Sequence, residues 1–141
     1  MVELHPLNSI ELKKTNNGYI PNFVNTPDIL PSVSVVTITY CREHLFELAV
    51  NNWQNFEYNG TMEWIILDDS PREIRKITKK LLPKNDKRIK YYSCNKIDSI
   101  GKKRNKIVEL AQNEIIVTMD DDDYYPHDSV YNRVMSLISS R

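Results

Sequence analysis

Glycine is scarce in this 141-residue chain, which contains only Gly18, Gly60 and Gly101. The phosphate-binding sequences G-x-G-x-x-G and G-x-x-x-x-G-K-[ST] need several closely spaced glycines, because the backbone must approach a phosphate. Neither can be written with these three positions. An EF-hand loop starting at Asp120 would need glycine at its sixth position, where Tyr125 stands. The sequence therefore excludes a dinucleotide-binding Rossmann site, a P-loop site and an EF-hand.

Cysteines and long apolar runs are also scarce. The two cysteines, Cys41 and Cys94, are too few for a disulfide framework, and we expect them to be small buried thiols. The longest unbroken apolar run, Trp64 to Leu67, is too short to cross a bilayer. The N-terminus lacks the basic and apolar regions of a signal peptide. We therefore expect a soluble, cytoplasmic protein without a membrane span.

The chain has no net charge, but its charges are unevenly distributed. From Arg72 to Lys106 there are fourteen Lys or Arg residues against three acids, which is a local charge of +11. Such a segment can attract an anionic partner. It lacks the interleaved aromatic residues of nucleic-acid-binding surfaces, so we expect no nucleic-acid partner. Most of these lysines are expected on solvated helix faces and loops.

The length and composition predict one globular domain preceded by an arm. Residues 1–31 contain four prolines and lack sustained periodicity, and we interpret them as an irregular N-terminal arm lying across the domain. Within the arm, Asn17-Gly18 predicts a hairpin between Ile10 to Lys14 and the residues from Tyr19 onward. Residues 32–141 form the predicted main domain.

Strand and helix patterns alternate regularly from Ser32. The predicted strands are Val33 to Thr39, Met62 to Asp69, Arg88 to Cys94 and Glu114 to Met119. The predicted helices are His44 to Phe56, a second one from the Ser70-Pro71 cap to Leu82, Gly101 to Asn113, and a last one capped by Asp128 and buried through Val130, Val134, Leu137 and Ile138. This alternation predicts an α/β fold with a mainly parallel sheet covered by helices on both faces.

Acidic residues follow two of the predicted strands. Asp68 and Asp69 close the second strand, and four consecutive aspartates, Asp120 to Asp123, follow the fourth. Open α/β sheets bind ligands at the carboxyl ends of their strands. Adjacent carboxylates repel one another, so a fold that orders them supplies a cation or hydrogen-bond donors. The run therefore predicts a divalent-metal site, and the alternative is a solvated loop at the positive end of the last helix.

Four segments, in this order, resemble the family 2 glycosyltransferases, which have the GT-A nucleotide-diphospho-sugar transferase fold. They are PSVSVVTITYCRE, similar to the family's first strand and "TYNR" end, WIILDDSP, similar to its "DDxS" turn, GKKRNKIVELAQNEIIVTMDDDD, and the trailing YYP. The resemblance covers about Pro31 to Val134. Two departures are Cys41, where asparagine is usual, and Asn113, where glycine is frequent.

The resemblance implies a metal-binding DXD motif within the acidic run, and with it Mn²⁺ or Mg²⁺ as cofactor. Asp122 is the expected direct metal ligand, with Asp120 as a second ligand or near the donor ribose or sugar. Asp121 and Asp123 would orient the loop or accept hydrogen bonds. The register stays open, because Asp121 and Asp123 also fit the motif, although aligning Met119 with the family's apolar residue favours Asp120 and Asp122.

The resemblance also implies a nucleotide site, whose residues are expected to be Thr39, Tyr40, Asp69, Arg104, Asp120 and Asp121. Asp69 resembles the acid that accepts a hydrogen bond from uracil, and the alternative role for Asp69 is helix capping. Thr39 and Tyr40 would flank the base, with the Tyr40 ring as a stacking face, unless Tyr40 belongs to the core. Arg104 would bring positive charge to the nucleotide or brace the acidic loop.

The function implied by the resemblance is transfer of a sugar from a nucleotide-diphospho-sugar, expected to be a UDP-sugar, to an acceptor hydroxyl. The family's catalytic base lies well beyond the DXD motif, and here only Tyr124 to Arg141 follow. We therefore interpret the chain as a nucleotide-binding half, truncated after the DXD region. A partner domain or a second copy would then supply the acceptor side. The alternative is a non-catalytic module that retains nucleotide and metal binding.

Overall fold

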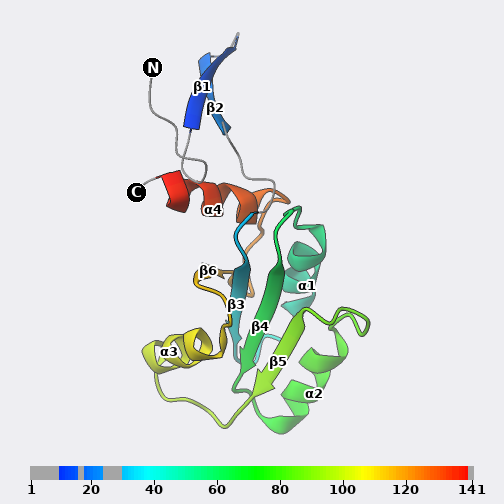
Figure 1. Cartoon of the computed structure of the whole chain (residues 1–141). Coiled ribbons are helices and arrows are strands. Elements are labelled where there is room, and N and C mark those ends of the chain that lie inside the picture. The colour runs from blue at the N-terminus through cyan, green and yellow to red at the C-terminus, as the bar shows by residue number, and fades with distance from the viewer. Residues whose placement is uncertain (1–9, 16–17, 24–29, 140–141) are drawn as a thin grey trace.

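The main domain is built on a parallel sheet. The computed structural model describes residues 10–15, 18–23 and 30–139 (Figure 1). In the main domain these residues form a four-stranded sheet with the order β5-β4-β3-β6. Its strands are β3 (Val33–Thr39), β4 (Met62–Asp68), β5 (Ile89–Ser93) and β6 (Ile115–Thr118). All three pairings are parallel, which confirms the predicted α/β class.

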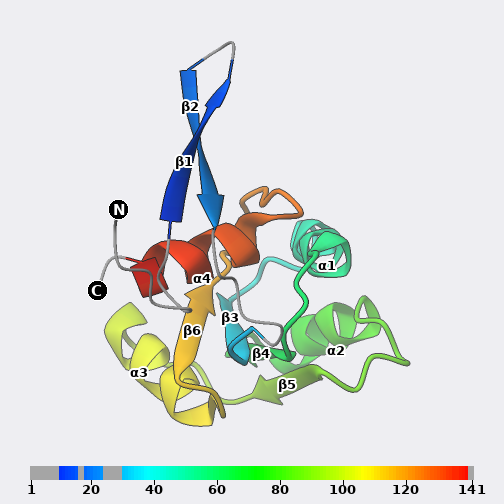
Figure 2. The ribbon, with the colours of Figure 1, turned by 45° about the horizontal axis from the view of Figure 1, so that its top comes forward.

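Helices cover both faces of this sheet, as predicted. They are α1 (Phe46–Asn55), α2 (Arg72–Lys80), α3 (Ile100–Leu110) and α4 (Ser129–Ser139). Figures 1 and 2 show α3 on one side of the sheet and α1 and α2 on the other. Since β3 to β5 progress in one direction and β6 lies on the other side of β3, right-handed crossovers place α3 on the opposite face from α1 and α2.

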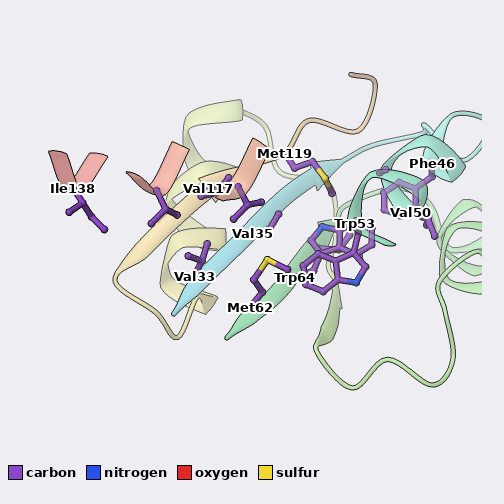
Figure 3. Close-up of a cluster of buried hydrophobic side chains, with 14 residues drawn as sticks. Val33, Val35, Phe46, Val50, Trp53, Met62, Trp64, Val117, Met119 and Ile138 are labelled. Carbon is purple, nitrogen blue, oxygen red and sulfur yellow. The ribbon is translucent and has the colours of Figure 1, made fainter. Parts of the chain in front are cut away.

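The larger core lies between the sheet and α1 and α4 (Figure 3). Alternate side chains of the central strands, including Val35 and Trp64, point into it. The Trp64 ring stacks on Phe46 with ring centroids 5.9 Å apart and on Trp53 at 5.6 Å. Large aromatic rings remove much apolar surface from water, so this stack fastens α1 to the sheet.

A smaller core lies under α3 on the other face. Val36, Ile65 and Leu67 project from the two central strands and meet Ile107 of α3. Because consecutive strand residues face opposite sides, the two central strands are buried on both faces and consist almost entirely of apolar or β-branched residues. The second core holds α3 against the sheet. Because α3 directly precedes β6, this contact also brings the chain to the start of β6.

Three sequence predictions need correction. Leu137 was expected in the core of α4 but is 47% exposed, and Met135, at 1%, is buried instead. Leu137 lies off the arc formed by Val130, Val134 and Ile138, which repeat every four residues. Ser70 does not cap α2, which has Pro71 at its N-cap position and no side-chain cap. Cys41 and Cys94 are free but only partly buried.

The N-terminal arm contains the predicted hairpin, but Gly18, which was expected in the turn, is the first residue of the second strand and pairs with Thr15. Strands β1 (Ile10–Thr15) and β2 (Gly18–Phe23) pair in antiparallel fashion. Residues 16–17 lie outside the described residues. Figures 1 and 2 show this hairpin projecting beyond α4, whereas the sequence analysis expected the arm to lie across the domain. No helix within residues 10–15, 18–23 and 30–139 has the length and apolar character needed to span a membrane.

The strand order creates a crevice at one edge of the sheet. The chain leaves β3 toward β4 on one side, and β6 returns to the other side of β3. The connection that leaves β3 contains α1, and the connection that enters β6 contains α3, so these two connections lie on opposite faces of the sheet. Ligands of open α/β sheets bind at such a switch point, beyond the carboxyl ends of the strands. In this chain the switch point lies between Thr39 at the end of β3 and the aspartates after β6.

At the amino end of the sheet, a charged cluster connects the residues just before β5 with α1. Asp86 accepts hydrogen bonds from Arg88 Nε and Nη2 and from Trp53 Nε1, each at 2.9 Å. The Arg88 guanidinium also lies 4.8 Å from the Trp53 ring centroid. The hydrogen bonds from Arg88, together with that from Trp53, outweigh partial burial and lower the pKa of Asp86 from 3.8 to about 2.

This shift predicts how Asp86 affects acid stability. Its pKa is lower in the folded state than in the unfolded state, so its stabilising contribution is present above about pH 3.8 and is lost as the pH falls toward 2. We expect Asp86→Asn to lower the melting temperature at neutral pH and to reduce the acid-induced loss of stability between these values. Melting curves from pH 2 to pH 7 measure this. Equal pH dependence in both proteins would contradict the assignment.

Candidate functional site

The predicted site residues meet at the carboxyl edge of the sheet. A cleft of about 310 Å³ is lined by Ile38, Thr39, Tyr40, Arg42, Ile100, Lys103, Arg104, Asp120, Asp121 and Asp122. An adjoining hollow of about 290 Å³ is lined by Tyr40, Asp69, Ser70, Pro71, Arg72, Arg75, Asn95 and Lys96. Tyr40 borders both spaces. The structure thus brings together Thr39, Tyr40, Arg104 and three aspartates of the run, with Asp69 on the far side of Tyr40.

Asp121 turns inward from the acidic run. It is 8% exposed, and its Oδ2 accepts a 2.7 Å hydrogen bond from Thr39 Oγ1. Burial raises the pKa of Asp121, and the Asp122 charge adds to the rise, while the Thr39 hydrogen bond and the Arg42 charge oppose it. Two residues earlier along β3, Thr37 Oγ1 donates a hydrogen bond to the Met119 carbonyl at 2.7 Å. Two threonine hydroxyls of β3 therefore hold the start of the acidic loop.

The neighbouring aspartates face outward. Asp120, Asp122 and Asp123 are exposed. Asp122 Oδ2 lies 3.3 Å from Arg42 Nη1, and both side chains are 44% exposed. An ion pair that is open to solvent contributes little stability. Asp122 therefore keeps most of its capacity to bind another cation.

The far end of the loop is held by α1. Asn52, which is 2% exposed, donates from Nδ2 to the Asp123 carbonyl at 2.7 Å and accepts from the Tyr125 amide at 3.1 Å. Tyr125 in turn accepts a hydrogen bond at its hydroxyl from the Asp120 amide at 2.9 Å. The backbone of the acidic run is therefore fixed at both ends, while two of its side chains project into the cleft.

Asp69 follows β4 and is buried, with one backbone and one charged neighbour. Its Oδ2 accepts a 2.8 Å hydrogen bond from the Ile97 amide, and its Oδ1 lies 2.9 Å from Lys103 Nζ. The side chain is 1% exposed. The predicted alternative, capping of α2, is not observed, because α2 has no side-chain cap. Asp69 instead connects the loop before α3 with a lysine of the cleft.

The Tyr40 ring has two lysine neighbours that the sequence analysis did not expect. Lys96 Nζ lies 5.0 Å and Lys103 Nζ 5.1 Å from its centroid. These are cation–π distances, and ammonium groups in this position are attracted by the ring. Tyr40 lines the cleft and does not belong to the core.

Several residues of the site were not predicted. Arg42, Lys103 and Asn52 contact Asp122, Asp69 and the Asp123 carbonyl, respectively. Arg42 carried a signal, since it ends the TYCR motif, whereas Asn52 carried none beyond being polar at a buried helical position. Within the described residues Arg104 forms no ion pair with the acidic loop, and Arg42 has that role instead.

The loop suits a metal ion that is shared with a ligand. Among residues 10–15, 18–23 and 30–139, no three His, Cys, Asp or Glu side chains are grouped closely enough to hold a metal. Asp120 and Asp122 offer exposed carboxylate oxygens beside a cleft that also holds cationic side chains. Mg²⁺ is usually held by one or two carboxylates together with substrate phosphates and water. The donor set therefore fits a divalent cation bound jointly with a phosphate ligand.

Solved structures share this fold. Residues 1–349 of S. aureus TarS, in complex with UDP-GlcNAc, match with a TM-score of 0.61 and 22% identity over 72% of this chain and 30% of that chain. The mannosyltransferase PcManGT from Pyrobaculum calidifontis, in complex with GDP-Man and Mn²⁺, matches with a TM-score of 0.60 and 22% identity over 78% and 35%. The likeness establishes the GT-A fold expected from the sequence.

The sequence itself establishes the family. The family described as "Glycosyl transferase family 2" matches residues 34–139. The GalNAc(5)-diNAcBac-PP-undecaprenol beta-1,3-glucosyltransferase of Campylobacter jejuni subsp. jejuni is 32% identical over 95 residues, which cover 67% of this chain and 30% of that protein. The chain belongs to glycosyl transferase family 2. It spans about a third of the length of these relatives.

The Thr39 hydroxyl is predicted to stabilise the acidic loop. In Thr39→Val the buried Asp121 carboxylate loses its donor, and we expect the free energy of unfolding to fall by about 1–3 kcal/mol. Thr39→Ser, the matched control, keeps the hydroxyl and loses one methyl group, which costs about 0.8 kcal/mol. Urea denaturation of the three proteins measures both effects. A serine variant less stable than the valine variant would contradict the role of the hydroxyl.

Cys41 lies in a backbone conformation that suits another residue. Its φ is 53°, in the left-handed region, and its amide donates to Ser70 Oγ at 2.8 Å. Asparagine tolerates this region better than other non-glycine residues, for which the cost is about 1–2 kcal/mol. We expect Cys41→Asn to raise the melting temperature and the β-branched Cys41→Val to lower it. A melting temperature that is lower for the asparagine variant than for wild type would contradict the strain.

Proposed function

We propose that this domain binds a nucleotide-diphospho-sugar, in particular a UDP-sugar, together with Mn²⁺ or Mg²⁺, as the donor site of a glycosyltransferase that acts on an acceptor hydroxyl. The observation that carries the proposal is the cleft at the switch point of the sheet. This one space is lined by the exposed Asp120 and Asp122, by Lys103 and Arg104 of α3, and by Tyr40. A nucleotide diphosphate has the matching parts, namely a planar base, a ribose and two phosphates.

The aspartates divide into two roles under this proposal. Asp121 is committed to Thr39 and holds the loop, so Asp120 and Asp122 are the carboxylates available to a cation. This supports the register Asp120 and Asp122, with Asp122 as the direct ligand. A bound divalent cation would offset the negative charge that develops on the departing diphosphate.

Cationic side chains supply the second part of the site. Lys103 and Arg104 line the cleft from α3, and Arg42 lines it from the loop after β3. Fixed positive charges in a cleft strengthen binding of a diphosphate and stabilise it as a leaving group. Lys103 is held between Asp69 and Tyr40, so its ammonium group is positioned before a ligand arrives. Asp69 thereby contributes to the nucleotide site both as an acceptor and by positioning Lys103.

The relatives support a nucleotide-sugar donor, and the bases of their bound nucleotides differ. TarS was solved with UDP-GlcNAc and PcManGT with GDP-Man and Mn²⁺. The Campylobacter jejuni relative is named as a β-1,3-glucosyltransferase whose substrate is linked through diphosphate to undecaprenol. We keep the uracil base as the proposal, because WIILDDSP carries the acidic turn that the family uses for uracil.

Metal-dependent donor binding tests the proposal. Isothermal titration with UDP-GlcNAc, UDP-glucose and GDP-mannose, with Mn²⁺ or with EDTA, should show binding of a UDP-sugar that Mn²⁺ strengthens. We expect Asp122→Ala to weaken the Mn²⁺-dependent binding by at least about 10-fold. The matched control is Glu57→Ala, which removes an exposed carboxylate that does not line the cleft. Absence of metal-dependent binding for every nucleotide sugar would refute the proposal.

A second measurement separates an enzyme from a binding module. Release of UDP from the bound UDP-sugar in the presence of Mn²⁺, lost in Asp122→Ala and retained in Glu57→Ala, indicates that the domain activates the donor. Binding without release in any condition indicates the non-catalytic module.

A further inference from the structure

A second hollow, of about 320 Å³, lies between α2 and the edge strand β5. It is lined by Arg72, Arg75, Lys76, Lys79, Tyr91 and Ser93. The four cationic residues occupy positions i, i+3, i+4 and i+7 of α2, which share one face of a helix. Four positive charges from one element therefore surround one concave space.

These cations have no acidic partners in the described part of the chain. Its ion pairs involve Arg42, Arg88, Lys90, Lys102, Lys103 and His127, and none of the four residues of the hollow. The buried Asp68 carboxylate, which contacts Tyr91 of the hollow, accepts hydrogen bonds from the Tyr91 hydroxyl at 2.6 Å and the Ser70 amide at 2.9 Å. Like charges on one helix face repel, so an anion bound between them would be stabilised by all four.

The sheet side of the hollow is rigid and adds neutral polar groups. The Tyr91 hydroxyl is fixed by Asp68 Oδ2, and it also lies 3.4 Å from the Arg75 carbonyl. Burial, the hydrogen bond to Asp68 and the Asp68 charge raise the pKa of Tyr91, so its hydroxyl stays neutral at neutral pH. Ser93, paired with Asp68 across the two strands, places a small exposed hydroxyl at the rim.

The hollow adjoins the donor site without being part of it. Arg72 and Arg75 line both this hollow and the one that contains Asp69. Lys76 and Lys79 line neither the space around Asp69 nor the cleft of the aspartates. We propose that the hollow between α2 and β5 binds a phosphate or diphosphate group of a ligand other than the sugar nucleotide. This inference does not depend on the proposed donor function.

Metal-free titration with inorganic pyrophosphate tests the site. EDTA in the buffer removes metal-dependent binding at the aspartates. We expect Lys76→Gln/Lys79→Gln to weaken pyrophosphate binding by at least about tenfold, because two charge-assisted contacts are lost. The matched control, Lys80→Gln/Lys106→Gln, removes the same charge from exposed positions that do not line the hollow, and it should bind within about twofold of wild type.

Two results would overturn the site. One is no pyrophosphate binding by the wild-type protein, and the other is an equal loss in both double variants, which would mean diffuse attraction by the basic segment. Titration of the Lys76→Gln/Lys79→Gln protein with a UDP-sugar and Mn²⁺ should match wild type. That measurement keeps failure of this site distinct from failure of the donor proposal.

Vesicles identify the source of the phosphate group. Co-sedimentation with phosphatidylglycerol vesicles, but not with phosphatidylcholine vesicles, that is lost in Lys76→Gln/Lys79→Gln and displaced by pyrophosphate supports a lipid headgroup. Pyrophosphate binding without vesicle binding supports a soluble phosphorylated ligand. Vesicle binding that is unchanged in the double variant and insensitive to pyrophosphate would contradict a role of the hollow at membranes.

Discussion

The geometry of the site depends on two buried hydroxyl groups of one strand. Thr37 and Thr39 lie two residues apart on β3, and their hydroxyls bind the Met119 carbonyl and the Asp121 carboxylate, each at 2.7 Å. Both threonines are almost fully buried. A buried carboxylate without a donor is costly, so these bonds determine which aspartate faces inward. The residues on either side of it, Asp120 and Asp122, are exposed.

Charge compensation connects this loop with the rest of the domain. The cleft brings the acidic run, which belongs to the negative part of the chain, against residues of the basic segment. Lys103 of the basic segment pairs with Asp69 after β4 and lies over Tyr40 after β3. The basic segment therefore has two environments. Lys103 contacts an acid, Asp69, and the Tyr40 ring. Lys76 and Lys79 of α2 instead line a hollow together with two arginines.

The spacing of apolar residues was enough to predict the fold, because this spacing indicates the type and the buried face of each strand and helix from its own residues. The strand ends and the acidic run placed the site at the carboxyl edge of the sheet, and the resemblance to family 2 glycosyltransferases named Thr39, Tyr40 and Arg104 of its lining. These arguments failed for contacts between distant residues. Nothing near Asn52 indicates that it binds the Asp123 carbonyl, 71 residues away, and nothing near Tyr40 indicates that lysines cover its ring. Such partners depend on helix orientation, which packing decides.

The ion pair between Arg42 and Asp122 contributes little stability, and this suits the proposed chemistry. The pair is long, at 3.3 Å, and both side chains are 44% exposed, so breaking it costs little. A divalent cation at Asp122 would compete with a single, solvated guanidinium. Arg42 lines the same cleft, so once released it remains beside the phosphates that such a cation would hold. Asp121 offers no comparable exchange, because its partner is a buried hydroxyl that solvent does not reach.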